Sequence, residues 1–345
     1  MRIRSLMRVF KDPAYVFKSS VHELCRIDGI NMKIAEKILN YKPNSFVNEQ
    51  IKKGESLGVT IITFWDDEYP FLLKKIYDPP VILFIKGTFI ENDIDSIAIV
   101  GTRMPTPYGR NIAQRLAEGL AKSGITIVSG FAKGVDGIAH QSALRVGGRT
   151  IAVMGNGLDI IYPDVNKKMV PLFSENGVFI SEFPFGTKPE AVNFPQRNRI
   201  ISGMSHATIV VEAGNRSGAL LTAFNAVDQN RDVFAVPGRL TDKNSIGCLR
   251  LIRHGAIPVH DVDQILDALK NQLRHPKRPV QKEIKLDLSR EERGIYNLLS
   301  DEPKHIDDIL QQTSMDPSKA LTILLSMELK GSISQLSGKH FVRNI

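Results

Sequence analysis

Residues 96–130, SIAIVGTRMPTPYGRNIAQRLAEGLAKSGITIVSG, contain the pattern that decides the fold. This stretch begins with the apolar run 96–100 and ends near a second run, 125–128, and both runs are rich in β-branched residues. Between them, apolar residues recur at three- and four-residue spacing from Ile112 to Leu120, which is typical of an amphipathic helix. Two apolar strands joined by a helix predict a parallel βαβ unit, because parallel strands need a long crossover connection.

The same alternation continues toward the C-terminus. Four more apolar runs follow, at residues 150–154, 177–180, 208–211 and 233–236. Continuous apolar strands that alternate with helices are typical of a sheet covered by helices on both faces. The sequence therefore predicts an α/β fold over residues 59–270, with a Rossmann-like, doubly wound parallel sheet.

A small helical domain is expected before this core, over residues 1–58. Residues 20–40 indicate two helices joined by a tight turn at Asp28-Gly29, because apolar residues recur at helical spacing around that turn. The pattern resembles a helix-hairpin-helix or SAM-like unit, whose turn amides can contact a phosphate. Asn31 stands where the helix-hairpin-helix unit normally has a second glycine, so a structural role is favoured over a DNA clamp.

Two further segments are expected after the core. Residues 271–285 contain two prolines, five basic residues and one acidic residue, and this composition predicts an extended basic linker. Residues 286–345 indicate helices, one of them capped by Asp316, followed by two short strands, and this order predicts a winged-helix domain. That domain has a net charge of −2, which favours a protein-binding or regulatory role over a recognition helix that grips phosphates.

Length and composition restrict the class of protein. With 345 residues, 42% hydrophobic and 24% charged, the chain is typical of a folded protein of two or three domains, and a disordered or fibrous chain is excluded. Cys25 and Cys248 cannot form a disulfide framework or a cysteine-rich zinc site, so we expect no metal and a cytoplasmic location. We find no signal peptide and no apolar stretch of about 20 residues, and we expect no membrane association. The net charge of +8 favours polyanionic partners.

The residues that follow the predicted strands are small or flexible. In an open parallel sheet, ligands bind beyond the carboxyl ends of the strands, and glycine there lets backbone N–H groups approach a ligand closely. Together with nearby cations, these glycines favour a phosphate ligand. The strand ends are Gly101-Thr102-Arg103, Ser129-Gly130, Gly155-Asn156-Gly157, Ser181-Glu182, Glu212-Ala213-Gly214 and Pro237-Gly238, and the cations are Arg103, Lys133, Arg197 and Arg199.

Three common types of site are not supported, and we expect no cofactor. The chain lacks the dinucleotide fingerprint G-x-G-x-x-G after the first of these strands, and it has no G-x-x-x-x-G-K-[ST] phosphate loop. Residues 214–218 have the wrong spacing for the G-x-S-x-G elbow of hydrolases. Asp136 and His140 share a helix face, but without a third partner we interpret them as a hydrogen-bonded pair that supports the loop.

The stretch 193–205 places two arginines around an asparagine at the start of a predicted short helix. Arg197 and Arg199 are together suited to a phosphate or a carboxylate, since guanidinium groups bind such anions in a bidentate manner. The alternative is a buried ion pair with Glu182 or Glu212.

Eight motifs follow one another along the core: AIVGTR, SGFAKGVDGIAH, AVMGNGLDIIYP, SEFPFGT, FPQRNRIISGMS, VVEAGNRSGALLTA, AVPG and SIGCLRLIRHGA. In this order they resemble the DNA-processing protein A family, also called DprA or Smf, over about residues 60–265. The resemblance implies a non-enzymatic protein that binds single-stranded DNA, protects incoming strands during natural transformation and loads the RecA recombinase. It also implies a homodimer.

The resemblance further implies a pocket for DNA phosphates at the strand ends. Only Phe131 and Tyr108 are aromatic residues near these positions, so we expect salt-dependent binding, dominated by the DNA backbone, with little sequence preference. Leu249 departs from the family, which usually has Asn or His at that point of the last motif. The implied pocket residues are Gly101, Thr102, Arg103, Ser129, Gly130, Phe131, Lys133, Arg197, Asn198 and Arg199.

One alternative from a different class stays open at this point. Rossmann-like pockets with glycine-rich strand ends also occur in hydrolases of nucleotides or nucleoside phosphates. Such an enzyme needs a carboxylate directed at the bound sugar, and Glu212 is the best candidate. Release of a base from a nucleotide would distinguish this enzyme from a DNA-binding mediator.

Overall fold

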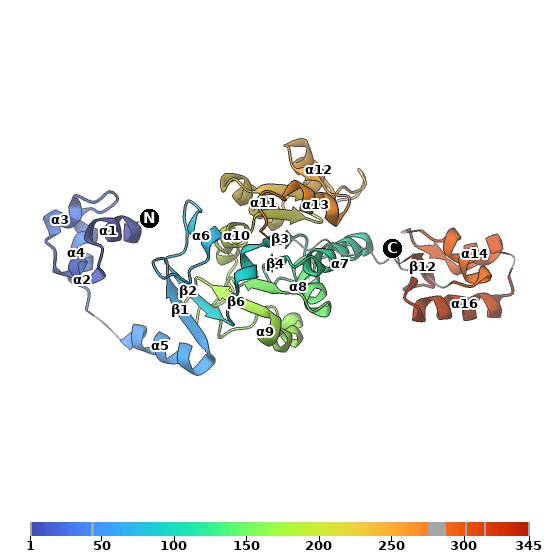
Figure 1. Cartoon of the computed structure of the whole chain (residues 1–345), viewed down its shortest axis with the longest axis horizontal. Helices are drawn as coiled ribbons and strands as arrows, with labels where there is room; N and C mark the ends of the chain where they lie inside the picture. The colour runs from blue at the N-terminus through green and yellow to red at the C-terminus, as the bar shows by residue number, and fades with distance from the viewer. Residues whose placement is uncertain (1, 43–44, 275–287, 301, 314, 344–345) are drawn as a thin grey trace. The chain divides into compact units, whose positions relative to one another are not determined.

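A computed structural model of the chain describes residues 2–42, 45–274, 288–300, 302–313 and 315–343 (Figure 1). The chain divides into two compact units, Met1–Pro279 and Val280–Ile345. Most of the predicted linker, 271–285, lies outside the described residues. The predicted boundary at residue 58 is a finer division than these units and stays a prediction.

Nine strands form one sheet within the described part of the first unit. In spatial order the strands are β1, β2, β6, β5, β4, β3, β7, β8 and β9. The seven strands from β6 to β9 in this order are parallel, whereas β1 and β2 are antiparallel to their neighbours. The strands are β1 (Val59–Thr63), β2 (Ile82–Lys86), β3 (Ser96–Val100), β4 (Thr126–Ser129), β5 (Thr150–Val153), β6 (Gly177–Ser181), β7 (Ala207–Val210), β8 (Asp232–Ala235) and β9 (Ile257–Pro258).

The predicted α/β fold with a doubly wound parallel sheet is confirmed. For each of the six predicted strands, the first and last residues agree with those of a strand in the structure to within one residue. The chain runs from β3 outward through β4, β5 and β6, and then returns to the other side of β3 with β7. The connections therefore diverge between β3 and β7, which is the switch point where ligands bind in open α/β sheets.

Helices cover both faces of this sheet (Figure 1). Successive residues of β3 point to opposite faces, so Ile97 and Ile99 belong to one core cluster while Ala98 and Val100 belong to another. The first cluster packs against α7 (Pro107–Lys122), α8 (Val135–Arg145) and α13 (Val262–Ala268). The second packs against α6 (Phe71–Lys74), α10 (Asn193–Gly203), α11 (Gly218–Asp228) and α12 (Ile246–Arg253). A further helix, α9 (Val170–Asn176), precedes β6.

The N-terminal residues form the predicted helical hairpin. Gly29 forms the turn with a φ of 79°, a left-handed conformation that glycine adopts without strain. Leu24, Ile27 and Ala35 belong to a small apolar cluster that these helices form among themselves, so the hairpin has a core of its own. The helices are α1 (Arg2–Phe10), α2 (Pro13–Lys18), α3 (Val21–Cys25), α4 (Met32–Leu39) and α5 (Ser45–Leu57).

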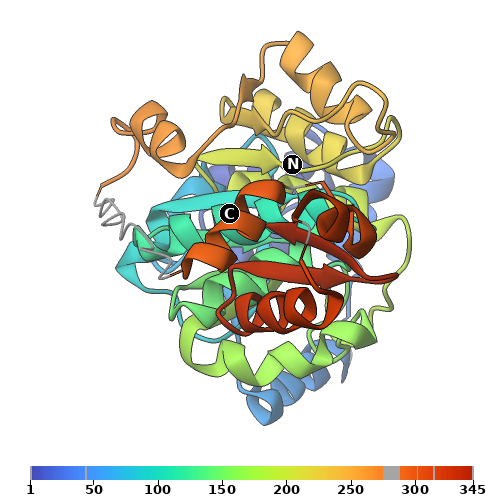
Figure 2. The same ribbon diagram turned by 90° about the vertical axis from the view of Figure 1, so that its right-hand side faces the viewer.

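The second unit has the predicted winged-helix order, and Figure 2 shows it in orange and red, with α16 running alongside the strands. Asp316 caps α16, since its carboxylate accepts hydrogen bonds from two backbone amides. On α16, Lys319 forms an ion pair with Glu291 at 2.5 Å, and Leu321, Leu325 and Leu329 are exposed. The elements are α14 (Arg290–Leu298), β10 (Lys304–His305), α15 (Ile306–Thr313), α16 (Pro317–Leu329), β11 (Ile333–Leu336) and β12 (His340–Arg343). None of the helices described for the whole chain is long and apolar enough to cross a bilayer.

Candidate nucleic-acid interface

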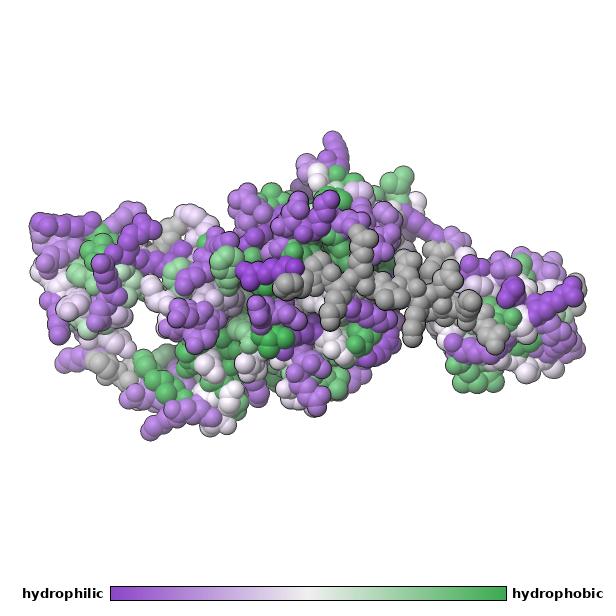
Figure 3. All heavy atoms as spheres, in the orientation of Figure 1, coloured by the Kyte–Doolittle hydropathy of each residue, from purple (hydrophilic) through white to green (hydrophobic). Residues whose placement is uncertain are grey.

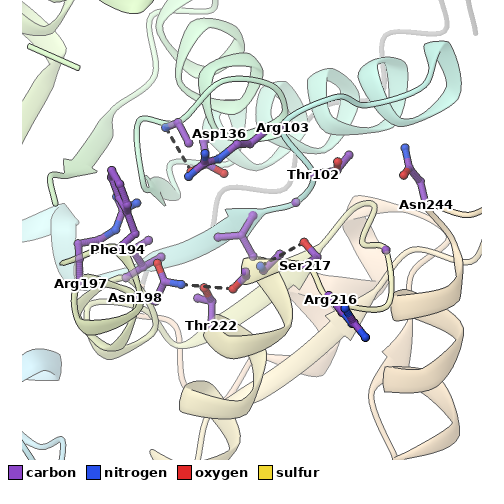
Figure 4. Close-up of a pocket in the computed structure, with 17 residues that line it drawn as sticks. Thr102, Arg103, Asp136, Phe194, Arg197, Asn198, Arg216, Ser217, Thr222 and Asn244 are labelled. Carbon is purple, nitrogen blue, oxygen red and sulfur yellow. Dashed lines mark hydrogen bonds between the residues drawn. The ribbon is translucent and has the colours of Figure 1, made fainter. Parts of the chain in front are cut away.

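A pocket of about 420 Å³ lies at the switch point, beyond the carboxyl ends of β3, β4 and β7. Figure 4 shows that side chains from several elements surround it. The loop after β3 contributes residues 101–103, and α10 contributes Phe194, Arg197, Asn198 and Ile201. The loop after β7 contributes Gly214 and Arg216, and it continues into the start of α11.

Three guanidinium groups and one carboxylate are the charged groups in the lining that the structure describes: Arg103, Arg197, Arg216 and Asp136. Arg103 and Arg216 are exposed, and neither forms a salt bridge with any described residue. The start of α11 adds to this positive charge, because backbone N–H groups at a helix N-terminus favour anions. The arrangement is therefore suited to an anionic ligand.

Arg197 is buried, with 4% of its surface exposed. It lines the pocket, but its guanidinium bonds to the protein itself. Its Nη1 donates hydrogen bonds to the carbonyl of Gly130, at 2.5 Å, and to that of Val153. Burial lowers the pKa of Arg197 to about 10, partly offset by the nearby Asp136 carboxylate. Arg197 thus remains charged at neutral pH and ties the loop after β4 to the end of β5.

Asp136 and His140 do not form the hydrogen-bonded pair that we predicted. The carboxylate of Asp136 accepts a hydrogen bond from the Ala132 amide at 3.4 Å, whereas Nδ1 of His140 lies 2.6 Å from Oγ1 of Thr150. Burial raises the pKa of Asp136, with Arg197 opposing the shift, and burial lowers the pKa of His140 to about 3. The imidazole is therefore neutral and belongs to the core.

The structure brings together many, but not all, of the residues predicted for the site. Ser129 is fully buried, and its hydroxyl donates to the carbonyl of Ile99 at 2.6 Å. A second pocket, of about 150 Å³, shares Arg103, Ala132 and Phe194 with the first. Gly101, Thr102, Arg103, Arg197 and Asn198 line the larger pocket, and Arg103, Gly130, Phe131 and Lys133 line the smaller one.

Arg199 lines neither pocket. Its guanidinium forms an ion pair with Glu182 at 2.5 Å and lies 3.6 Å from the carboxylate of Asp78. Of the two interpretations of this stretch of sequence, the alternative with an ion pair to Glu182 is the arrangement present. Arg197 and Arg199 therefore do not act together on one anion, because their side chains leave α10 in different directions.

Phe131 contributes only its backbone to the smaller pocket. Its ring is fully buried and packs against Phe173 and Phe179, with ring centroids 5.7 and 5.3 Å away. Two other aromatic rings are open to a ligand: that of Phe194, which lines both pockets, and that of Tyr162, which lines the smaller one and is 41% exposed. The guanidinium of Arg103 lies 5.6 Å from the centroid of the Phe194 ring, and that of Arg197 lies 5.8 Å from it.

Sequence reasoning missed several residues of the site, among them Phe194 and Arg216. Both stand in motifs of the core, where Phe194 precedes the two arginines of the stretch 193–205 and Arg216 lies within residues 214–218. The position of Arg216 in the loop after the strand 208–211 was the signal that could have found it, since the carboxyl ends of parallel strands share one edge of the sheet.

The loops that form the pocket are bonded to one another. The Thr102 amide donates to the carbonyl of Glu212 at 2.7 Å, and the Val135 amide donates to the carbonyl of Thr102 at 3.2 Å. Gly134 has a φ of 81°, and a Cβ atom there would lie 2.4 Å from the Thr102 carbonyl oxygen. A Cβ atom at Gly130 would lie 2.5 Å from Nη1 of Arg197. These two glycines therefore permit close contacts within the protein, and Gly130 also lines the smaller pocket.

Glu212, the carboxylate required by the hydrolase alternative, is not directed into the pocket. It is 4% exposed, and its two oxygens accept hydrogen bonds from the Thr106 amide at 2.9 Å and from the Thr106 hydroxyl at 2.5 Å. The Thr106 hydroxyl in turn caps α7 by accepting from the Gly109 amide at 3.1 Å. Glu212 therefore anchors the start of α7. Among the residues that the structure describes, no group of three or more metal-binding side chains is present.

Fold and pocket together define a doubly wound α/β protein with an anion site at its switch point. Comparisons with known proteins identify the family. The family model described as DNA recombination-mediator protein A matches residues 60–270, and the model of the DprA winged helix domain matches residues 279–339. The chain belongs to the DNA recombination-mediator protein A family, also called DprA or Smf.

Relatives match most of the chain. Protein Smf of Synechocystis is 34% identical over 99% of this chain and 94% of its own length. The crystal structure of DNA processing protein A from Streptococcus pneumoniae has a TM-score of 0.68 at 34% identity, and the match covers 77% of this chain and 92% of that one. A structure of DNA processing protein A from Helicobacter pylori, reported for its unique single-stranded DNA binding mode, has a TM-score of 0.56 at 31% identity and covers 63% of this chain and 97% of that one.

Proposed function

We propose that this protein is a non-enzymatic recombination mediator that binds single-stranded DNA at the switch-point pocket. The observation that carries the proposal is the pocket itself, which has three guanidinium groups against one carboxylate and a helix N-terminus in its wall. The likeness to the Helicobacter pylori protein supports DNA as the anion. A flexible single strand also suits a pocket with an accessible aromatic ring, because bases stack on such rings.

Within this proposal, Arg103 and Arg216 contact the DNA backbone directly, since both are exposed. Gly101, Thr102, Gly130, Lys133 and Asn198 complete the contact surface. Ser129, Phe131, Arg197 and Arg199 act by holding the loops and α10 in place.

Membership of the family supports a wider biological role within this proposal. The protein protects strands that enter the cell during natural transformation, loads the RecA recombinase onto them, and acts as a homodimer in the cytoplasm. These steps need a protein that holds DNA without altering it, which agrees with a pocket in which the described carboxylates are engaged by the protein itself.

The first test is the salt dependence of DNA binding by Arg103→Ala. Each lost phosphate contact should lower the slope of log affinity against log salt by about 0.7 for a single strand. The matched control is Arg253→Ala, which removes an exposed arginine of α12 that does not line the pocket. Fluorescence anisotropy with labelled oligo(dT) should show weaker binding and a smaller slope for Arg103→Ala alone. Equal affinities and slopes in all three proteins would remove Arg103 from the site.

A second test separates the mediator from the hydrolase alternative. The protein is incubated with nucleotides, and free bases are measured by chromatography. We expect no release, because both oxygens of Glu212 are bonded to Thr106. Sustained release that is abolished by Glu212→Gln would contradict a purely non-enzymatic role.

A further inference from the structure

Positive charge is concentrated in the N-terminal helices α1–α4. Residues 1–42 contain nine lysines and arginines against four aspartates and glutamates, so they account for +5 of the chain's net charge of +8. Figure 3 shows that hydrophilic residues dominate the visible face of these helices. Such a local excess attracts polyanions.

Two of the four acidic side chains are engaged in capping helices. Asp12 accepts a hydrogen bond from the Ala14 amide at 2.7 Å, and Glu23 accepts one from the Ser20 amide at 2.8 Å. By contrast, Lys18 and Lys42 are exposed, and among the described residues neither forms a salt bridge. Their charges are therefore available to a partner.

The turn of the helical hairpin is not suited to bind a polyanion. Asn31 replaces the second glycine of the turn, and its side chain accepts a hydrogen bond from the Ile34 amide at 3.0 Å. One of the amides at the start of α4 is thus already satisfied by the protein. This contact supports the structural role predicted for the hairpin.

An exposed pair of aromatic rings lies elsewhere on the same module. The rings of Phe17, in α2, and Tyr41, just after α4, have centroids 6.4 Å apart and planes inclined by 34°. Their exposed fractions are 52% and 48%, so half of each side chain remains open to solvent. Lys18 and Lys42 are their immediate neighbours in the sequence. Exposed rings beside lysines match the stacking surfaces on which proteins hold single-stranded nucleic acids.

We infer that Phe17 and Tyr41 form a second contact surface for single-stranded DNA, where bases stack on the rings while Lys18 and Lys42 neutralise phosphates. The inference rests on the proposed function for the identity of the polymer, but it uses no residue of the switch-point pocket. A protein partner would need complementary carboxylates, and it is the competing outcome of the test.

The test uses the full chain and measures affinity for oligo(dT) together with photochemical crosslinks between thymine and protein. Loss of stacking on one ring should weaken binding about fivefold or more, from roughly 1–3 kcal/mol per stacked base. We expect this loss for Phe17→Ala and Tyr41→Leu, while Tyr41→Phe retains affinity because the ring remains. Mass spectrometry should find crosslinks on the peptide that contains Phe17 or Tyr41. Both rings are half exposed, so their removal should leave the helical circular dichroism unchanged.

Phe71→Ala is the matched control, because Phe71 is also 52% exposed and has the Lys75 ammonium 3.9 Å from its ring centroid, but belongs to α6. Unchanged affinity in Phe17→Ala and Tyr41→Leu, or an equal loss in Phe71→Ala, would overturn the inference while leaving the proposed function intact. A loss in the ring variants with normal binding by Arg103→Ala would instead support the second surface and contradict the assignment of Arg103 to the pocket. No binding of oligo(dT) by the unmodified protein would overturn both.

Discussion

Removal of the Glu212 carboxylate should destabilise the core of this protein, although the residue follows a strand end where ligands usually bind. The perturbation is Glu212→Ala. It deletes the acceptor for two hydrogen bonds from Thr106, at 2.9 Å to the amide and 2.5 Å to the hydroxyl. The site is 4% exposed, so water cannot readily replace the lost partner.

The magnitude follows from these contacts. A hydrogen bond to a charged group contributes about 1.5–3 kcal/mol, and a buried donor left without a partner loses its full desolvation energy. Two bonds to one carboxylate therefore predict a loss of about 3–5 kcal/mol in the free energy of unfolding. Glu212→Gln should cost only about 1 kcal/mol. Its amide oxygen can accept from the Thr106 amide, and its NH₂ group can donate to the second lone pair of the Thr106 hydroxyl.

Urea unfolding measures this difference, and Trp65 reports it because it is the chain's sole tryptophan and follows β1 of the core sheet. With a slope of roughly 3 kcal/mol per molar urea, a loss of about 3 kcal/mol moves the midpoint by about 1 M. The double variant with Thr106→Ala should lose only about 1 kcal/mol more than Glu212→Ala, because the bond between the two side chains is already absent and the further loss is the Thr106 cap of α7. A midpoint for Glu212→Ala within error of the unmodified protein would refute the anchoring role, as would equal damage by Ala and Gln.

Three further predictions concern other contacts of the fold. Gly134→Ala should destabilise the core by several kcal/mol and weaken DNA binding in parallel, since the φ of 81° and a Cβ atom 2.4 Å from the Thr102 oxygen both oppose a side chain; equal thermal melting would contradict this. Arg197→Lys should lose affinity for oligo(dT), measured by anisotropy, because one ammonium cannot reproduce a guanidinium that bonds two loop carbonyls. Lys330 and the backbone of Ser289 lower the pKa of Glu292 to about 2 from its ordinary value of 4.5, so the stability of the second unit should be complete above pH 4.5 and fall as the pH drops toward 2. Circular dichroism melts of Glu292→Gln should lack this pH dependence.

The parallel part of the sheet could be predicted because its strands are buried on both faces and stand out as apolar runs. The residues of β3 show this directly, since all five are buried. The antiparallel strands β1 and β2 were not predicted. Both have exposed positions, as in Thr60 and Ile82, and they do not alternate with long helices. The two-residue strand β9 is too short to produce a pattern at all.

The site was predictable as a location but not residue by residue. Parallel topology brings the strand ends together, which placed Gly101–Arg103 at the pocket. The direction of each side chain depends on tertiary packing, which the pattern along the chain does not contain. Arg197 and Arg199 are two residues apart on one helix, so they point to different sides of it. Arg199 forms an ion pair with Glu182. Phe131 has a φ of 56°, and its ring enters the core rather than the pocket.

The hydrogen bonds between the pocket loops determine whether the protein or the DNA loses conformational entropy on binding. Thr102 is bonded to the loops on either side of it, and Arg197 ties the next loop to β5. A preorganised pocket of this kind loses little freedom when a ligand arrives, so almost all of the ordering must occur in the strand. Oligonucleotides of equal charge should then differ in affinity according to their own stiffness. The protein would act as a fixed template on which the DNA alone changes shape.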